Sequence, residues 1–222
     1  MRMLAALSDL VLPIDCGGCG AVGTRWCERC RGRMRDDPIA LTPRVAVGAP
    51  VWALGRYRAP FATSVLAMKE HRRRDLAQPI GSALASTLRT LARWSEVPDA
   101  AHLYLVPAPT RMLAARRRGG DTVTAFAGVA AARLGPAVSV APLLRTAGSV
   151  RDSMGLDARR RATNMSGAIR IRRRPATRLP TENHAVILVD DVLTTGATAA
   201  ESVKVLATQR VFVDCVVVIA GA

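Results

Sequence analysis

Residues 186–201 read VILVDDVLTTGATAAE and contain two kinds of side chain that could do chemistry together, carboxylates and hydroxyls. The unbroken apolar run over residues 186–189 is typical of a strand buried on both faces, so Asp190 and Asp191 are expected where that strand ends. Carboxylates at a strand end are good acceptors for the vicinal hydroxyls of a ribose. The acid pair therefore predicts contacts with a sugar.

The residues after the two acids predict a phosphate-binding turn. Thr194, Thr195, Gly196, Ala197 and Thr198 lead into a helical stretch over residues 199–208. The first amides of a helix lack intrahelical partners, glycine permits a tight turn, and threonines add hydroxyl donors. Neither the Walker loop nor the dinucleotide glycine fingerprint is written here. We expect a ribose-phosphate site; the alternative is a buried strand followed by an acidic helix cap.

Residues 16–30 read CGGCGAVGTRWCERC and place four cysteines as two C-x-x-C knuckles. Cys16, Cys19, Cys27 and Cys30 have the spacing of a tetrahedral zinc site, and the glycines let the chain turn around the metal. Disulfide pairing is the competing interpretation, which a cytoplasmic chain does not favour. Because some forty residues cannot bury enough core to fold alone, we expect the zinc to be structural. Cys215 lies in an apolar run over residues 211–219 and is expected to be a packed strand residue.

The net charge of the chain limits the classes of molecule that it is expected to bind. Its 222 residues include 32 basic and 17 acidic side chains, for a net charge of +15. An excess of this size indicates a polyanionic partner or several phosphates to hold, and an arginine-rich solvated surface is the alternative. Aromatic residues make up 4%, which leaves little for a base-stacking platform. No stretch has the length and apolar character of a membrane span, so we expect a cytoplasmic protein without membrane insertion.

The elements that must position these residues alternate between strand and helix. Strands are predicted over residues 51–57, up to about residue 106, and over residues 137–141, 186–189 and 211–219; helices are predicted over residues 61–71, 77–93 and 121–134. This alternation predicts an α/β fold with a parallel sheet flanked by helices, and ligands at the carboxyl ends of its strands. The proline-rich stretch 36–50 suits a linker, which gives a zinc-knuckle segment and linker over residues 1–44 and a second domain over residues 45–222.

Five motifs occur in an order that resembles one known family. They are the four-cysteine knuckles, VPAP at residues 106–109, RRRGGDT at 116–122, RDSMGLDARRRATN at 151–164, and VILVDDVLTTGAT at 186–198. Together they look like the ComF family of phosphoribosyltransferase-like proteins associated with natural competence, and the resemblance covers essentially the entire chain. It implies a type I phosphoribosyltransferase fold with a small N-terminal zinc-binding segment.

The resemblance also implies roles for individual residues toward phosphoribosyl pyrophosphate (PRPP). Asp190 and Asp191 would contact the ribose hydroxyls and act as the catalytic pair. The residues implied to hold the 5-phosphate are Thr194, Thr195, Gly196, Ala197 and Thr198; those implied at the pyrophosphate are Pro107, Ala108 and Pro109. The candidates for a basic surface or a lid are Arg116, Arg117, Arg118, Arg151, Arg161 and Asn164. The chain departs from the family at Gly120, Asp121 and Thr122, where Phe-Asn-Gln is more usual, and at Ser153, where Gln is more usual.

By the same resemblance, the activity would be transfer of a phosphoribosyl group with release of pyrophosphate. Mg²⁺ bridging the ribose and the pyrophosphate would offset charge on the leaving group. No segment reads as an acceptor-binding hood, so the acceptor is open. The alternative is a non-catalytic protein that senses PRPP or binds nucleic acid. The family implies single-stranded DNA and other competence or DNA-processing proteins as further partners.

Overall fold

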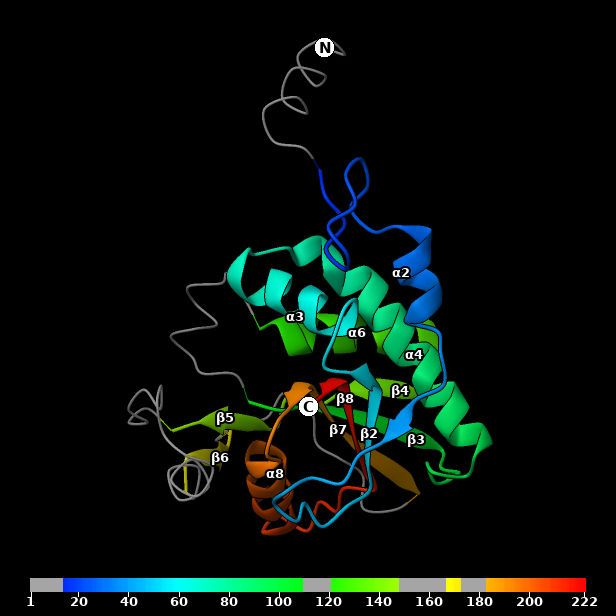
Figure 1. Ribbon diagram of the computed structural model, residues 1–222. Helices are drawn as coiled ribbons and strands as arrows, with labels where there is room; N and C mark the ends of the chain where they lie inside the picture. The colour runs from blue at the N-terminus through cyan, green and yellow to red at the C-terminus, as the bar shows by residue number, and fades with distance from the viewer. Residues whose placement is uncertain (1–13, 110–120, 148–166, 173–182) are drawn as a thin grey trace.

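The computed structural model describes residues 14–109, 121–147, 167–172 and 183–222 (Figure 1). Within these residues the centre of the fold is a six-stranded sheet in the order β1-β2-β8-β7-β3-β4. Every neighbouring pair of strands is parallel except β1 with β2. The strands are β1 (Ile39–Ala40), β2 (Val51–Arg56), β3 (His102–Pro107), β4 (Val138–Val140), β7 (His184–Leu193) and β8 (Cys215–Gly221).

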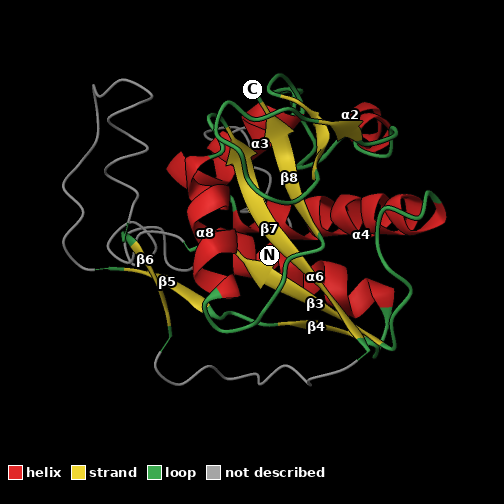
Figure 2. Ribbon diagram, turned by 90° about the horizontal axis from the view of Figure 1, so that it is seen from below, coloured by secondary structure: helices red, strands yellow, loops and turns green. Residues whose placement is uncertain are grey.

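Helices cover both faces of this sheet (Figures 1 and 2). One face carries α3 (Phe61–Glu70), the 3₁₀ turn η1 (Arg74–Leu76), α4 (Ala77–Arg93) and α6 (Thr122–Leu134), and the other carries α8 (Ala197–Ala207). Each face therefore has its own apolar core cluster, as a buried parallel sheet requires. The predicted α/β fold with a parallel sheet flanked by helices is confirmed, except that the short edge strand β1 is antiparallel.

Helix α4 shows how the apolar spacing positions these layers. Its residues Ile80, Leu84, Leu88 and Leu91, spaced at the helical period, are all buried in the core beneath it. Gly81 permits close packing on α6, since a Cβ there would lie 2.5 Å from the Phe126 carbonyl oxygen. Among the described helices, none is both long and apolar enough to cross a membrane.

A second, two-stranded antiparallel sheet joins β5 (Leu144–Thr146) to β6 (Ile169–Ile171) beside α8. The Gly167 amide at its edge donates a hydrogen bond to Glu201 Oε1 on α8, at 2.7 Å. The sequence patterns did not predict β5, because three-residue strands carry too short an alternation to stand out.

The three elements around the acid motif differ in their bounds from the sequence prediction. Strand β7 runs past residue 189 to Leu193, because β8 supplies ladder partners as far as Gly221. Helix α8 begins at Ala197 rather than at residue 199, after Gly196 in the left-handed region at φ 89°. The predicted start of the last strand at residue 211 is wrong: Asp214 bonds the backbone of Val186 at 2.8 and 2.9 Å, and regular pairing begins only after it.

The N-terminal segment packs on the helices of the α4 face. Its helix α2 (Glu28–Arg33) begins at the second knuckle, and Met34 after it is buried in the same core cluster as α3 and α4. The stretch predicted as a linker supplies strand β1, which lies before the predicted boundary at residue 45 and pairs with β2, which lies after it. Further along it, the Val45 amide donates to the Thr195 carbonyl at 2.9 Å. The division into residues 1–44 and 45–222 stays a prediction.

Candidate functional site

The site begins where β7 loses one of its two neighbours. The ladder between β3 and β7 ends at the pair Pro107 and Val189, while the ladder between β7 and β8 continues to Leu193. The Ala108 amide makes a last bond to the Val189 carbonyl, at 2.7 Å, and the chain then leaves the sheet. Among the described residues, no strand pairs with this edge of β7 from Asp190 onward, at the carboxyl end of the sheet where ligands of α/β proteins bind.

The two acids point to opposite faces of the sheet, because successive residues of a strand alternate. Asp190 lines a small cup together with Thr194 to Thr198 on the α8 side. Asp191 Oδ1 accepts a hydrogen bond from Lys69 Nζ of α3 at 2.7 Å, on the other face. Asp191 is 9% exposed, so this ion pair lies largely out of water. Asp190 therefore faces the loop, whereas Asp191 is paired with Lys69.

The loop that follows β7 forms a cup of about 30 Å³ with the first residues of α8. The predicted residues Thr194, Thr195, Gly196, Ala197 and Thr198 all line it. Gly196 cannot be replaced without strain: its φ is 89°, and a Cβ there would lie 2.8 Å from the Pro43 Cβ. Together with the bond from Val45 to Thr195, this contact shows that residues 43–45 brace the loop from behind.

The cup opens into a larger hollow of about 400 Å³. This hollow is lined by Tyr57, Lys69, Pro109, Asp190, Asp191, Val192, Thr194 and Thr198. Four separate parts of the chain meet here: the end of β2, helix α3, the turn after β3, and the β7–α8 junction. A hollow of this size, with carboxylates, hydroxyls and one amine converging on it, is large enough for a small polar ligand.

The ionisation of Asp190 is set by this arrangement. Burial and the negative charge of the adjacent Asp191 raise the pKa of Asp190 to about 7, although the Asp191 amide donates to Asp190 Oδ1 at 2.8 Å and Lys69 lies nearby. Near neutral pH, Asp190 therefore exchanges between an acceptor and a proton donor. Such a shift in a hollow with a specific charge partner is characteristic of functional sites.

The structure brings together some of the predicted site residues and leaves others out. Of the VPAP turn, Pro109 lines the hollow, while Pro107 and Ala108 are buried at the end of β3. The basic and lid candidates Arg116, Arg117, Arg118, Arg151, Arg161 and Asn164 lie outside the described residues. The β7–α8 string and the turn after β3 are therefore the parts of the predicted site that the structure places.

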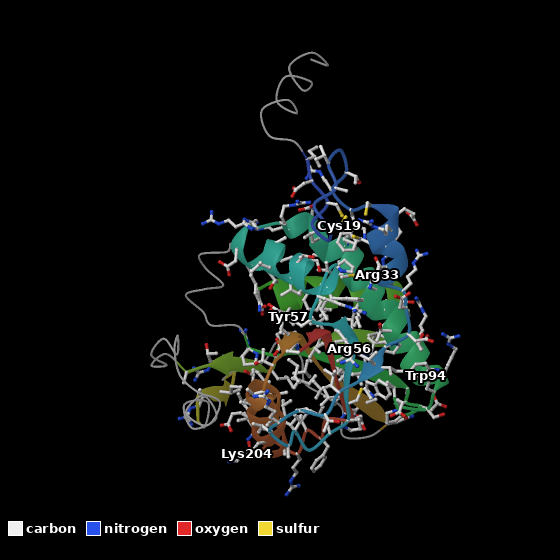
Figure 3. The ribbon with its side chains drawn as sticks, in the orientation of Figure 1. Cys19, Arg33, Arg56, Tyr57, Trp94 and Lys204 are labelled. Atoms are coloured by element: carbon white, nitrogen blue, oxygen red, sulfur yellow. The ribbon has the colours of Figure 1, made fainter. Side chains whose placement is uncertain are left out.

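Sequence reasoning missed Lys69 and Tyr57. Tyr57 follows β2, is 52% exposed, and lies beside α3 (Figure 3). Lys69 carried a signal that could have been read: the chain has two lysines, Lys69 and Lys204, against thirty arginines. The ammonium of lysine is a compact point charge, which suits pairing with a single carboxylate oxygen better than the planar fork of arginine does. A rare lysine in an arginine-rich chain is therefore a candidate for such a pair.

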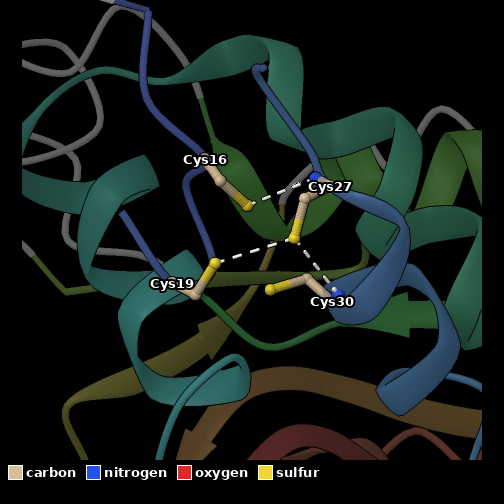
Figure 4. A group of neighbouring side chains, drawn as sticks. All are labelled: Cys16, Cys19, Cys27 and Cys30. Atoms are coloured by element: carbon tan, nitrogen blue, oxygen red, sulfur yellow. Dashed lines mark hydrogen bonds between the residues drawn. The ribbon is translucent and has the colours of Figure 1, made fainter. Parts of the chain in front are cut away.

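The four cysteines of the N-terminal segment form the second candidate site (Figure 4). The Sγ atoms of Cys16, Cys19, Cys27 and Cys30 all lie within 4.8 Å of one another, and Cys19 and Cys27 are 3.6 Å apart. A tetrahedral zinc ion with Zn–S bonds of about 2.3 Å separates its sulfurs by about 3.8 Å. The four thiols therefore fit a zinc ion with small adjustments, and none of them is in a disulfide.

Backbone amides already stabilise charge on this cluster. The Cys27 amide donates to Cys16 Sγ at 3.3 Å, and the Cys30 amide donates to Cys27 Sγ at 3.5 Å. Two hydrogen bonds lower the pKa of Cys19 to about 6: the larger contribution comes from the Ala21 backbone, and the next from the Arg29 side chain. Thiolates are the metal-binding form of cysteine, so these contacts favour a metal at Cys19, whereas burial and the neighbouring thiols raise the pKa of Cys30 as long as no cation is bound.

The cluster packs against residues next to α3 and η1. Cys16 and Cys30 are buried, and a Cβ on Gly18 would lie 2.8 Å from Cys30 Sγ and 2.9 Å from the Pro60 Cβ. Arg73 ties the segment to η1: its guanidinium bonds Asp75 at 2.9 Å, Asp15 at 3.1 Å and the Arg25 carbonyl at 3.2 Å. The hydrogen bond from Arg73 also lowers the pKa of Asp75.

Neither the models of known protein families nor the curated proteins compared with the chain give a match. The mostly parallel α/β sheet fits a phosphoribosyltransferase-like fold, and the four clustered cysteines could hold a zinc ion.

Proposed function

We propose that the chain is a ComF-type phosphoribosyltransferase-like protein that binds Mg²⁺-PRPP at the carboxyl end of β7. The observation that carries the proposal is the single hollow in which Pro109, the two acids and the loop threonines meet. PRPP has a 5-phosphate, two ribose hydroxyls and a pyrophosphate, which need amide and hydroxyl donors, carboxylate acceptors and a cation side by side.

Each part of the ligand has a matching group. The 5-phosphate would lie at the loop threonines and the first amides of α8, and the ribose hydroxyls would donate to Asp190. The carboxylates are hard oxygen donors of the kind that Mg²⁺ takes in small number beside substrate phosphates. Lys69, which pairs with Asp191 at 2.7 Å, would bring positive charge to the pyrophosphate side near Pro109.

The chemistry that follows from such binding is displacement at C1 of the ribose. The C1–O bond to pyrophosphate breaks, the leaving group takes the electron pair, and a nucleophile of the acceptor forms the new bond. In its ionised form, Asp190 would stabilise the positive charge that develops on the ribose ring. Tyr57 stands half-exposed at the rim, where a planar acceptor could stack on its ring.

Calorimetric titration of Mg²⁺-PRPP into the zinc-loaded protein tests the proposal. We expect Thr194→Val with Thr198→Val to weaken binding about tenfold or more, because two hydroxyl donors are lost at the phosphate. Lys204→Met, on α8 but outside both the cup and the hollow, is the matched control and should bind as the unmutated protein does. Absence of binding to the unmutated protein would refute the proposal.

Release of pyrophosphate from PRPP, measured against a panel of purine and pyrimidine bases, separates a transferase from a PRPP sensor. Release that depends on one base and is lost in Asp190→Asn establishes transfer. Tight binding without release in any mixture favours the sensor.

The net charge of +15 favours a second candidate function, the binding of single-stranded DNA. Contacts to many phosphates predict an affinity that falls steeply with salt, and a further loss when Arg116, Arg117 and Arg118 are replaced together. A weak affinity that is insensitive to salt would contradict this role.

The cysteine cluster completes the proposal as a structural zinc site. With four thiolates the coordination of zinc is closed, so the metal offers no position for a substrate. Zinc analysis of the purified protein should give one ion per chain.

A further inference from the structure

A second hollow, of about 360 Å³, lies where the zinc-knuckle segment meets the helices of the α4 face. Its walls come from the residues around α2 and from α4 and α6, which lie together in Figure 1. Four arginines line it: Arg31 and Arg35 from the knuckle segment, Arg89 from α4 and Arg133 from α6. Among the described residues that line it, none is an aspartate or a glutamate.

Most of these charges have no counter-ion in the part of the chain that the structure describes. Arg31 pairs with Glu28 at 3.0 Å, whereas Arg35, Arg89 and Arg133 form no ion pair among the described residues. Asp36 and Asp37 follow Arg35 in the chain but do not line the hollow. Like charges that converge on one concave surface repel one another, so the surface gains most from an anion that several of them can share.

The hollow is also partly preorganised. The Arg89 guanidinium donates a hydrogen bond to the Arg133 carbonyl, which ties α4 to α6 and fixes the direction of the side chain. Met34 is buried, and Trp26 is half-buried against the core, so both supply an apolar wall. The arginines themselves are exposed, and a guanidinium that is already held by such a hydrogen bond, as Arg89 is, loses less freedom when it binds phosphate oxygens.

We propose that this hollow is a second anion site and that it takes a compact small molecule carrying two or more phosphate groups. Its volume is that of small-molecule sites, and the four arginines that line it come from three separate parts of the chain and surround one hollow instead of following a track along the surface. Bidentate contacts from arginine to phosphate are the interactions that such a set makes best. The inference does not depend on PRPP binding at β7.

The site exists only when the knuckle segment is docked. Arg31 and Arg35 belong to that segment, and Arg89 and Arg133 belong to the helices beneath it. A ligand that bridges the two parts binds the docked state better than the undocked state, so it also stabilises docking. This gives the zinc segment a role as one wall of a binding site.

The test is titration of inorganic tripolyphosphate into the zinc-loaded full-length chain at fixed ionic strength. We expect Arg89→Ala with Arg133→Ala to weaken binding about tenfold or more, because two charge-assisted contacts are lost. The matched control is Arg33→Ala with Arg170→Ala, which removes the same charge from two exposed arginines outside the hollow and should change affinity less than about twofold.

Two further arms locate the binding. Thr194→Val with Thr198→Val removes phosphate donors of the β7 loop and should leave unchanged the tripolyphosphate binding that depends on Arg89 and Arg133. If all binding is lost in that variant and none in the arginine variant, the anion binds at the β7 loop and the proposal is overturned. Equal losses in the arginine variant and its control would also overturn it, since they indicate general charge. An oligothymidylate that binds through Arg89 and Arg133 more tightly than tripolyphosphate would show an extended strand to be the ligand and refute a compact one. Unchanged circular dichroism and zinc content exclude loss of fold.

Discussion

The cysteine cluster and the β7 site differ in how far along the chain their parts lie. All four thiols come from residues 16–30 and meet within 4.8 Å. The β7 site joins Asp191 to Lys69, which precedes it by 122 residues, and adds Tyr57 and Pro109, which follow the ends of two other strands. A spacing motif therefore describes the whole of the first site and about half of the second.

The largest expected effect comes from breaking the local site. Cys30→Ser should lose the zinc ion and undock the knuckle segment, because structural zinc contributes on the order of 10 kcal/mol to segments of this kind. Zinc content, thermal melting and tryptic cleavage after Arg25 and Arg29 measure the loss. Cys215→Ala is the control, since Cys215 is buried in β8 away from the cluster and should keep its zinc. A Cys30→Ser protein with full zinc content and unchanged melting would contradict the cluster's structural role.

The next effect tests the long-range contact that no motif contained. Lys69→Met should destabilise the fold by about 2 kcal/mol, because it leaves the Asp191 carboxylate unpaired beside Asp190. The side chains of Lys69 and Asp191 are 29% and 12% exposed, so solvent offsets only part of the loss. Urea unfolding measures the change. Lys204→Met, at the other lysine, should stay within about 0.5 kcal/mol of the unmutated protein.

The double variant Lys69→Met with Asp191→Asn sharpens this result. If the cost of Lys69→Met is the stranded carboxylate, neutralising Asp191 should recover most of it. A double variant that is as unstable as the sum of the two single variants would mean that Lys69 stabilises α3 by packing alone.

The sequence predicted the elements where a pattern repeats and missed contacts where none does. The helix over residues 77–93 was predicted at its observed bounds, because its apolar residues recur at the helical period over four turns. The end of β7 was misplaced, because whether a strand continues past Asp190 depends on β8 as its partner and not on its own residues.

The candidate site follows the same rule. Asp190 and the residues from Thr194 to Thr198 line one cup as the local string predicted. Lys69 and Tyr57 were not predicted, because their position depends on the packing of α3 and β2 beside β7, which is a property of the whole fold. The position of residues 43–45 behind the loop was hidden for the same reason: the stretch reads as a linker, yet Pro43 and Val45 contact Gly196 and Thr195.

A smaller effect on stability is expected at Gly196, where residues 43–45 pack against the loop after β7. Gly196→Ala should cost about 1–2 kcal/mol, since its φ of 89° disfavours any side chain and the new Cβ would press on Pro43. Gly128→Ala on α6 is the matched control, because no neighbour lies within 4 Å of its added Cβ, and it should be neutral or stabilising. Thermal melting compares them, and a Gly196→Ala protein as stable as Gly128→Ala would show that residues 43–45 do not brace the loop.

The smallest expected effect concerns Asp190 and depends on pH. Burial and the neighbouring Asp191 raise its pKa from 3.8 in the unfolded chain to about 7 in the fold. Between these values the folded state holds a proton that the unfolded state has lost, so the contribution of Asp190 to stability falls as pH rises through this window. Asp190→Asn cannot ionise and keeps an oxygen for the Asp191 amide. A pKa shift of this size would amount to about 4 kcal/mol for a fully buried group. Because Asp190 is only half-buried and solvent screens its charge, we expect Asp190→Asn to be more stable than the unmutated protein by about 1 kcal/mol above pH 7, and equal to it near pH 4.

The same substitution separates the two regions by what their charged groups do. At the cysteine cluster, loss of a ligand is expected to remove both metal binding and stability, because a structural zinc ion would supply both. At β7, Asp190→Asn should gain stability above neutral pH while it loses affinity for Mg²⁺-PRPP, since an amide cannot accept from the ribose as a carboxylate does. Urea unfolding at several pH values, beside titration with the ligand, measures the two changes on one protein. An Asp190→Asn protein that loses stability at every pH would make Asp190 a structural residue. A gain in stability together with a loss of affinity is what we expect of a residue that binds the ligand and destabilises the fold.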